Sequence, residues 1–124
     1  MKFTQLIGKI KGQPDYEKHF KQATDFLTKK GYIVINPVTM VQLHENLLAF
    51  ELDEYDRLQL CKASIEFYFN DCNGKATIGK EFTIHALWNW RNSPGALEEK
   101  ELADLLGIKT IELTYNEVYN NEEI

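Results

Sequence analysis

Apolar and polar positions along the chain predict strands and helices in succession. Residues 2–7 and 32–36 form short apolar runs typical of buried strands, and Gly31 and Pro37 delimit the second run. Between them, apolar side chains recur at helical spacing, at Tyr16, Phe20, Ala23, Phe26 and Leu27. A strand, a helix and a strand within about 35 residues indicate a βαβ unit, so the two strands should be parallel.

The middle of the chain carries a less regular pattern. Residues 41–60 are expected to be helical, with a break near residues 50–53. The aromatic run at 64–69 and the segment 75–87 are typical of strands, and the turn-forming residues 70–74 between them favour a hairpin. The hairpin is expected to be an insertion around residues 70–82.

The end of the chain is predicted to hold a helix, a strand and a tail. Residues 93–107 show helical spacing, and residues 110–113 form a last short strand. The acidic, Asn-rich residues 115–124 are expected to be loose. With no linker or repeat, residues 1–114 should form a single α/β domain.

One helix carries an unexpected carboxylate. Ser93 is a suitable N-cap, Pro94 fits the first helical position, and Gly107 ends the pattern. On this helix Glu99 lies in the middle of the apolar face, in line with Ala96. A buried carboxylate either pairs with a neighbouring side chain or belongs to a functional site, and the helix alone leaves both readings open.

Three segments should meet at one edge of the sheet. In an open α/β sheet, ligands bind at the carboxyl ends of the strands. The loop 8–12, the segment after Asn36 and the segment 90–95 all follow or approach such ends. The loop has glycine at both ends and two lysines, so it is either a plain turn or a weak anion-binding signal.

Composition narrows the classes of function. The 124 residues have a net charge of −5, which argues against a binder of DNA or RNA polymers but leaves room for a pocket that holds a phosphate. Cys61 and Cys72 show no metal-binding spacing and are expected to be free thiols, and the three histidines are scattered. No apolar stretch resembles a signal peptide or a membrane span, so we expect a cytoplasmic protein with no membrane partner.

Three stretches of sequence resemble one family. They are the loop 8–12 (a GxIxG segment), a Y-x₃-F-x₂-A-x₃-L-x₃-GY-x-V-x-NP pattern over residues 16–37, and a W-x₂-S-x-GA-x₂-E-x₃-A-x₂-LG pattern over residues 90–107. The chain resembles the often phage-associated, nucleoside 2-deoxyribosyltransferase-like proteins known as DUF4406. The resemblance implies a flavodoxin-like three-layer fold with a mainly parallel sheet.

The resemblance also implies a chemistry. In active deoxyribosyltransferases, a Glu four residues after a Gly attacks the anomeric carbon of the sugar, and by that motif Glu99 is the expected catalytic nucleophile. The residues expected to bind the nucleoside or nucleotide are Gly8, Lys9, Tyr16, Asn36, Asp53, Trp90, Ser93 and Gly95. Trp90 would either stack on the base or simply belong to the core. No metal and no cofactor are expected.

The sequence departs from the family pattern in one place. Where the family usually has a Cys-Asp pair, the best match is Cys61-Lys62, and an alternative alignment to residues 83–87 also lacks the acid. Two functions therefore stay open. One is a nucleoside or nucleotide N-glycosidase or 2-deoxyribosyltransferase acting through Glu99, and the other is a non-catalytic nucleotide-binding module. Because small family members commonly complete the cleft across subunits, a homo-oligomer is also expected.

Overall fold

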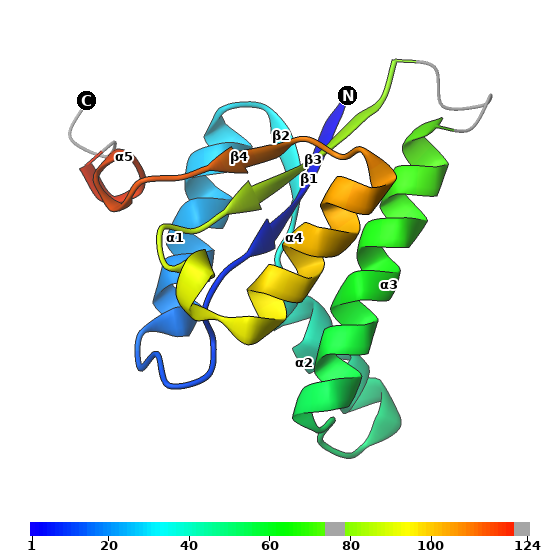
Figure 1. Cartoon of the computed structure of the whole chain (residues 1–124). Helices are drawn as coiled ribbons and strands as arrows, with labels where there is room; N and C mark the ends of the chain where they lie inside the picture. The colour runs from blue at the N-terminus through cyan, green and yellow to red at the C-terminus, as the bar shows by residue number, and fades with distance from the viewer. Residues whose placement is uncertain (74–78, 121–124) are drawn as a thin grey trace.

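A parallel sheet forms the centre of the molecule (Figure 1). The computed structural model describes residues 1–73 and 79–120, and this part of the chain contains four strands and five α-helices. The strands are β1 (Lys2–Ile7), β2 (Tyr32–Ile35), β3 (Glu81–Ala86) and β4 (Thr110–Glu112). The helices are α1 (Tyr16–Lys29), α2 (Pro37–Leu48), α3 (Glu54–Asn73), α4 (Pro94–Leu106) and α5 (Tyr115–Asn120). The strand order is β2-β1-β3-β4 and every neighbouring pair is parallel.

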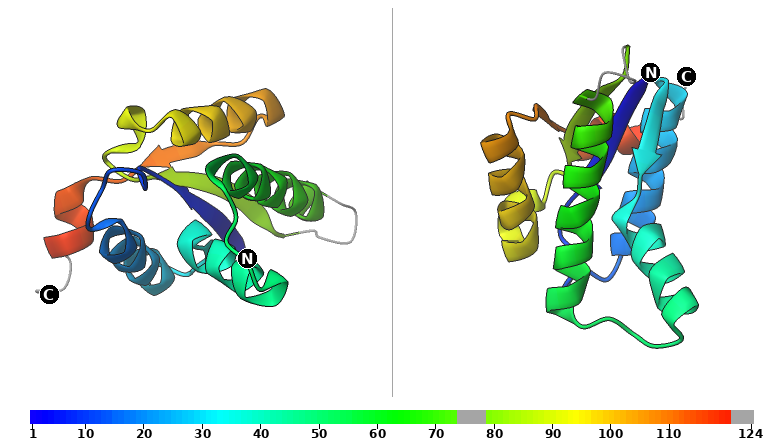
Figure 2. Two further views of the ribbon diagram at one scale, coloured as in Figure 1. Left: turned by 90° about the horizontal axis from the view of Figure 1, so that it is seen from below. Right: turned by 90° about the vertical axis from the view of Figure 1, so that its right-hand side faces the viewer.

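Helices cover both faces of the sheet (Figure 2). Successive side chains of β1 point to opposite faces, so Leu6 and Ile7 enter different cores. Leu6 packs with α1 and α5, whereas Ile7 packs with Ile65 of α3 and Ala103 of α4. These three layers and the strand order are those of a flavodoxin-like α/β fold, as the sequence predicts.

The predicted hairpin is wrong. Residues 64–69 belong to helix α3, and β3 pairs in parallel with β1 and β4. A strand would place Ile65 and Phe67 on the same face, but Ile65 is fully buried while Phe67 is exposed. Cys61 and Ile65, four residues apart, are both buried, so helical spacing decides the structure over the β-propensity of the aromatic run. Residues 74–78 of the expected insertion lie outside the described part of the chain.

The expectation of a loose tail is also wrong for residues 115–120. They form α5, whose Val118 is buried against the α1 side of the sheet. Thr114 and Glu117 form a capping box, in which each residue's backbone N–H donates to the other's side chain at 3.2 Å or less. His19 Nδ1 lies 2.6 Å from the hydroxyl of Tyr119. Residues 121–124 lie outside the described residues.

Other predicted elements agree with the structure within a few residues. The break expected near residues 50–53 separates α2 from α3, and Ala49, in the left-handed region at φ 63°, ends α2. The helix predicted at 93–107 is α4, with Ser93 as its N-cap and Gly107 as its left-handed C-cap. None of the described helices has the length and apolar character needed to cross a membrane.

Candidate functional site

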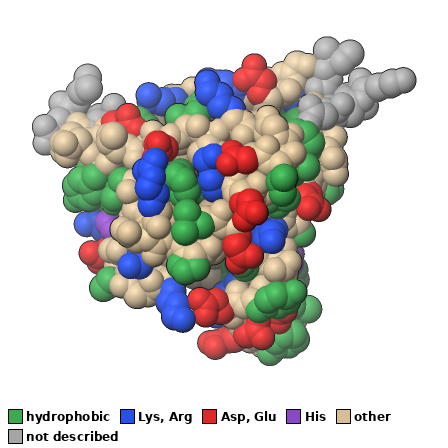
Figure 3. All heavy atoms as spheres, viewed as in Figure 1, with side chains coloured by type: hydrophobic (Ala, Val, Ile, Leu, Met, Phe, Trp, Pro, Cys, Tyr) green, Lys and Arg blue, Asp and Glu red, His purple; other side chains and the backbone are tan. Residues whose placement is uncertain are grey.

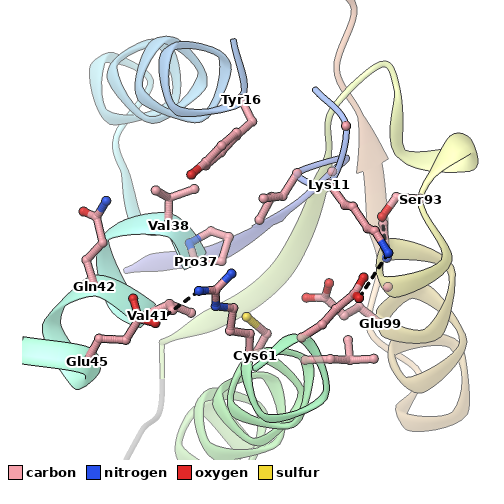
Figure 4. Close-up of a pocket in the computed structure, with 18 residues that line it drawn as sticks. Lys11, Tyr16, Pro37, Val38, Val41, Gln42, Glu45, Cys61, Ser93 and Glu99 are labelled. Carbon is pink, nitrogen blue, oxygen red and sulfur yellow. Dashed lines mark hydrogen bonds and ion pairs between the residues drawn. The ribbon is translucent and has the colours of Figure 1, made fainter. Parts of the chain in front are cut away.

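A cavity of about 480 Å³ lies at the carboxyl ends of β1 and β3. The order of the strands reverses between these two neighbours, which is where open α/β sheets bind ligands. The walls come from the β1–α1 loop, the start of α1, one side of α2, the first half of α3 and the start of α4 (Figure 4). The volume falls in the range that suits a small organic ligand.

Close packing explains the glycine at the end of β1. A Cβ on Gly8 would lie 2.7 Å from Cδ1 of Leu87, closer than carbon atoms approach. The next residue, Lys9, donates its backbone N–H to Oδ1 of Asn89 at 3.0 Å. Together these contacts fix the β1–α1 loop against the loop that follows β3, so two walls of the cavity are held relative to each other.

The N-terminus of α4 points its first turn at the cavity. Ser93 Oγ accepts a hydrogen bond from the backbone N–H of Ala96 at 3.1 Å, and Pro94 occupies the first helical position. A Cβ on Gly95 would have only ordinary contacts, the nearest at 3.7 Å from Leu58 Cδ1. Gly95 is therefore not demanded by packing, and its small size leaves open space at the cavity wall.

Glu99 follows one turn later, and its carboxyl group is the most unusual group of the site. The residue is only 8% exposed, and its Oε2 atom has no hydrogen-bond partner among the described residues. Burial and, to a smaller extent, the charge of Glu98 raise the pKa of Glu99 to about 8 against the opposing effect of Lys62. A buried carboxyl with an unused oxygen at a cavity wall can bind a ligand hydroxyl or, once deprotonated, attack a carbon atom.

A buried polar network holds α3 behind Glu99. Gln5 of β1 donates from Nε2 to the carbonyl of Cys61 at 3.0 Å and accepts from Ser64 Oγ at 2.7 Å. Cys61 thereby lines the cavity with its thiol directed inward (Figure 4). Burial raises the pKa of the Cys61 thiol, and the neighbouring Glu99 raises it further, so Cys61 stays a neutral thiol.

Two cations line the cavity, and each has an acidic partner. Lys11 of the β1–α1 loop pairs with Glu54 of α3 at 3.3 Å, and both side chains are exposed. Arg57 of α3 pairs with Glu45 of α2 at 3.2 Å. The second pair is supported by the backbone N–H of Leu52, which donates to the same Glu45 oxygen at 2.8 Å. The two ion pairs place charged groups at the cavity, and a charged ligand can replace one member of either pair.

The structure brings five of the nine candidate residues together. Gly8, Tyr16, Ser93, Gly95 and Glu99 all line the cavity, although they come from three different segments of the chain. Glu99 is buried on the same face as Ala96 and Ala103, as the helical periodicity predicts. This convergence follows from the parallel topology.

The other four candidates do not line the cavity. Asn36 caps α2 through a 3.0 Å bond from the Val38 N–H, and Asp53 caps α3 through a 2.8 Å bond from the Asp56 N–H. Lys9 contributes its backbone to Asn89, as described above. Trp90 belongs to the core, where its Nε1 donates to Glu112 at 2.9 Å, so the stacking alternative does not hold.

The segment after Asn36 was expected at the site, but the candidates included no side chain within α2 or α3. Lys11, Glu45, Arg57 and Cys61 line the cavity but were not candidates. The signal that could have identified the α3 residues is a spacing of three and four residues, which places four side chains on one face of a helix: Glu54, Arg57, Leu58 and Cys61. Lys62, at the position that best matches the family's acid, lies inside α3.

The described residues contain no group of three or more His, Cys, Asp or Glu side chains placed to hold a metal ion. Within the same residues, Cys61 and Cys72 are free and buried, as expected from their spacing.

Comparison with known protein families gives a match over most of the chain. The family model described as "Domain of unknown function (DUF4406)" matches residues 3–112, which include the four described strands apart from Lys2 and all the cavity-lining segments. No curated protein and no solved structure matches the chain. On this match over most of its length, the chain belongs to the DUF4406 family.

Proposed function

We propose that the protein binds a nucleoside or nucleotide in the cavity and cleaves or transfers its N-glycosidic bond through Glu99. The observation that carries the proposal is the buried carboxyl group at the wall of a nucleoside-sized cavity, whose Oε2 has no partner within residues 1–73 and 79–120. The resemblance of residues 90–107 to the nucleoside 2-deoxyribosyltransferase motif supports the same residue.

In this mechanism the deprotonated Glu99 forms a bond to C1′ of the sugar while the C1′–N bond breaks. The electron pair of that bond stays on the base, which takes up a proton. Water or a second base then attacks C1′, and the Glu99 carboxylate leaves. The backbone N–H of Gly95 and the Ser93 hydroxyl, both at the cavity wall, would bind sugar or phosphate oxygens.

A binding module is the second candidate, and the protonation of Glu99 favours it. With a pKa of about 8, the carboxyl group is mostly neutral at pH 7 and can donate a hydrogen bond to a ribose hydroxyl. In that case the cavity holds a nucleotide without breaking it. The buried free thiols fit a reducing compartment, so the cytoplasm is the proposed location for either function.

The test is a panel of ribo- and deoxyribonucleosides and their monophosphates, incubated with wild type, Glu99→Gln and the exposed neighbour variant Glu101→Gln. Released base is measured by chromatography, and binding is measured as a rise in melting temperature. Base release by wild type and Glu101→Gln, but not by Glu99→Gln, supports the enzyme. A raised melting temperature without base release supports the binding module, and neither effect from any compound contradicts both.

A further inference from the structure

The connection between α2 and α3 exposes an apolar surface that the proposed function does not use. Its large side chains, between 50% and 76% exposed, are Leu43, Leu47, Leu48, Phe50 and Tyr55, which we call the α2–α3 tip. In Figure 3 green side chains gather at the lower right end of the molecule, where these helices lie in Figure 1. Clustered exposed side chains of this size mark an interaction surface.

Acidic residues surround this surface. Glu51, Asp53, Glu54 and Asp56 are all exposed, and Figure 3 shows red side chains beside the green ones. The lysine and arginine that reach this region are already paired, Arg57 with Glu45 and Lys11 with Glu54. The tip therefore combines exposed apolar side chains with a negative field.

Three of the four acidic residues have a role within the fold, whereas the apolar side chains stay largely uncovered by the described residues. Asp53 caps α3, and Glu54 and Asp56 lie in its first turn, where negative charge is stabilised by the helix dipole. In contrast, Leu47 and Phe50 keep most of their surface exposed. A partner that covers these clustered apolar side chains would explain why they are exposed in the isolated chain.

The charge selects the kind of partner. An anionic lipid surface would be repelled by the four carboxylates. A second copy of this chain, meeting the tip face to face, would place the same carboxylates opposite one another. We propose that the α2–α3 tip docks a basic amphipathic helix of another protein, whose apolar side covers the leucines while its Lys or Arg residues meet Glu51 and Asp56. If this helix occupies the tip, the homo-oligomer expected from the sequence forms through a different surface of the molecule.

The test uses two labelled peptides of about 18 residues, long enough for a five-turn helix. Both carry Leu at helical spacing, one with Lys and the other with Glu at the remaining positions. Fluorescence anisotropy with the full-length protein should give at least about tenfold tighter binding of the Leu–Lys peptide than of the Leu–Glu peptide. Equal affinities would overturn the proposal.

Matched variants locate the binding. Leu47→Ser with Phe50→Ser should weaken binding of the Leu–Lys peptide about tenfold, because both side chains are central to the tip. Leu105→Ser, at a residue of α4 that is 79% exposed, should leave binding unchanged. Glu51→Lys should weaken binding of the Leu–Lys peptide and strengthen binding of the Leu–Glu peptide.

Two results would contradict this placement. One is unchanged peptide binding by the Leu47→Ser, Phe50→Ser variant. The other is a dimer of the wild type, seen by sedimentation, that the same double variant dissociates, since this would assign the tip to a second copy.

Discussion

The buried carboxyl group of Glu99 suits the proposed chemistry but lowers the stability of the fold. Its periodicity on α4 could be read from the sequence, because Ala96, Ala103 and the capping signals fix the face of the helix. That Oε2 lacks a partner in the described part of the chain could not be read from the sequence, since this depends on which side chains of α3 meet α4. A local pattern predicts a residue's face, whereas its partners are set by tertiary packing.

Replacing Glu99 should stabilise the protein while removing any catalysis. A raised pKa means that stability is fully present below the unfolded pKa of 4.5 and is lost as the pH rises through about 8. Glu99→Gln should therefore raise the free energy of unfolding at pH 8 by on the order of 2 kcal/mol. Urea unfolding at pH 8 and pH 5 checks this, and a gain that does not shrink at pH 5 would argue against a buried carboxyl group.

Gly8 and Gly95 both line the cavity but differ in what surrounds them. Gly8→Ala should destabilise the fold by about 1–3 kcal/mol, because the new methyl group would overlap Leu87. Gly95→Ala should change stability little and should weaken the melting-temperature shift caused by a ligand, since it fills open space at the cavity wall. Thermal melting of both variants, with and without the ligand, tests the pair; equal destabilisation would contradict it.

Among the elements, α4 and α1 were predictable because their apolar periodicity and end signals agree. The strand predicted at residues 64–69 is wrong. That prediction followed the local β-propensity of the aromatic residues, whereas the four-residue spacing of Cys61 and Ile65 indicates a helix. For α5 the signal was present, since Thr114 and Glu117 form a capping box, but the acidic composition of the segment obscured it.

The packing of α5 can be tested by removing its buried side chain. Val118→Ala should lower the free energy of unfolding by about 1–3 kcal/mol, because Val118 is buried in the core on the α1 side of the sheet. Asn116→Ala, on the exposed side of the same helix, is the control and should have little effect. Chemical denaturation measures both variants. A loss of unfolding free energy in Val118→Ala that is smaller than the error of the measurement would support a loose tail instead of a packed α5.

For the whole molecule, the parallel topology predicts where a site lies but not all that lines it. The βαβ pattern and the strand ends correctly place Gly8, Ser93 and Glu99 at one edge of the sheet. The shared helical face of Arg57 and Cys61 could be read from their spacing, but their place in the cavity wall could not, because it depends on how α3 packs beside α4.

Two buried groups should give the fold a stability maximum in weakly acidic solution. The buried His85, whose Nδ1 lies 2.7 Å from Thr4 Oγ1, has a pKa lowered to about 4 by burial and by Lys30 and Lys2. Its contribution is present above pH 6.5 and is lost as the pH falls through about 4, whereas that of Glu99 is lost as the pH rises through about 8. Unfolding free energies measured from pH 4 to pH 9 should peak between about 5 and 7. A profile that rises steadily to pH 9 would contradict the assignment for Glu99.

The central claim is that Glu99 bonds to the sugar, and a covalent intermediate tests it most directly. The protein is mixed with the nucleoside or nucleotide that releases base, quenched in acid within the first turnovers, and analysed by intact-protein and peptide mass spectrometry. A glycosyl adduct is expected on the peptide that contains Glu99, absent from Glu99→Gln and present in Glu101→Gln. Base release that continues in Glu99→Gln, with no adduct on wild type, would contradict it.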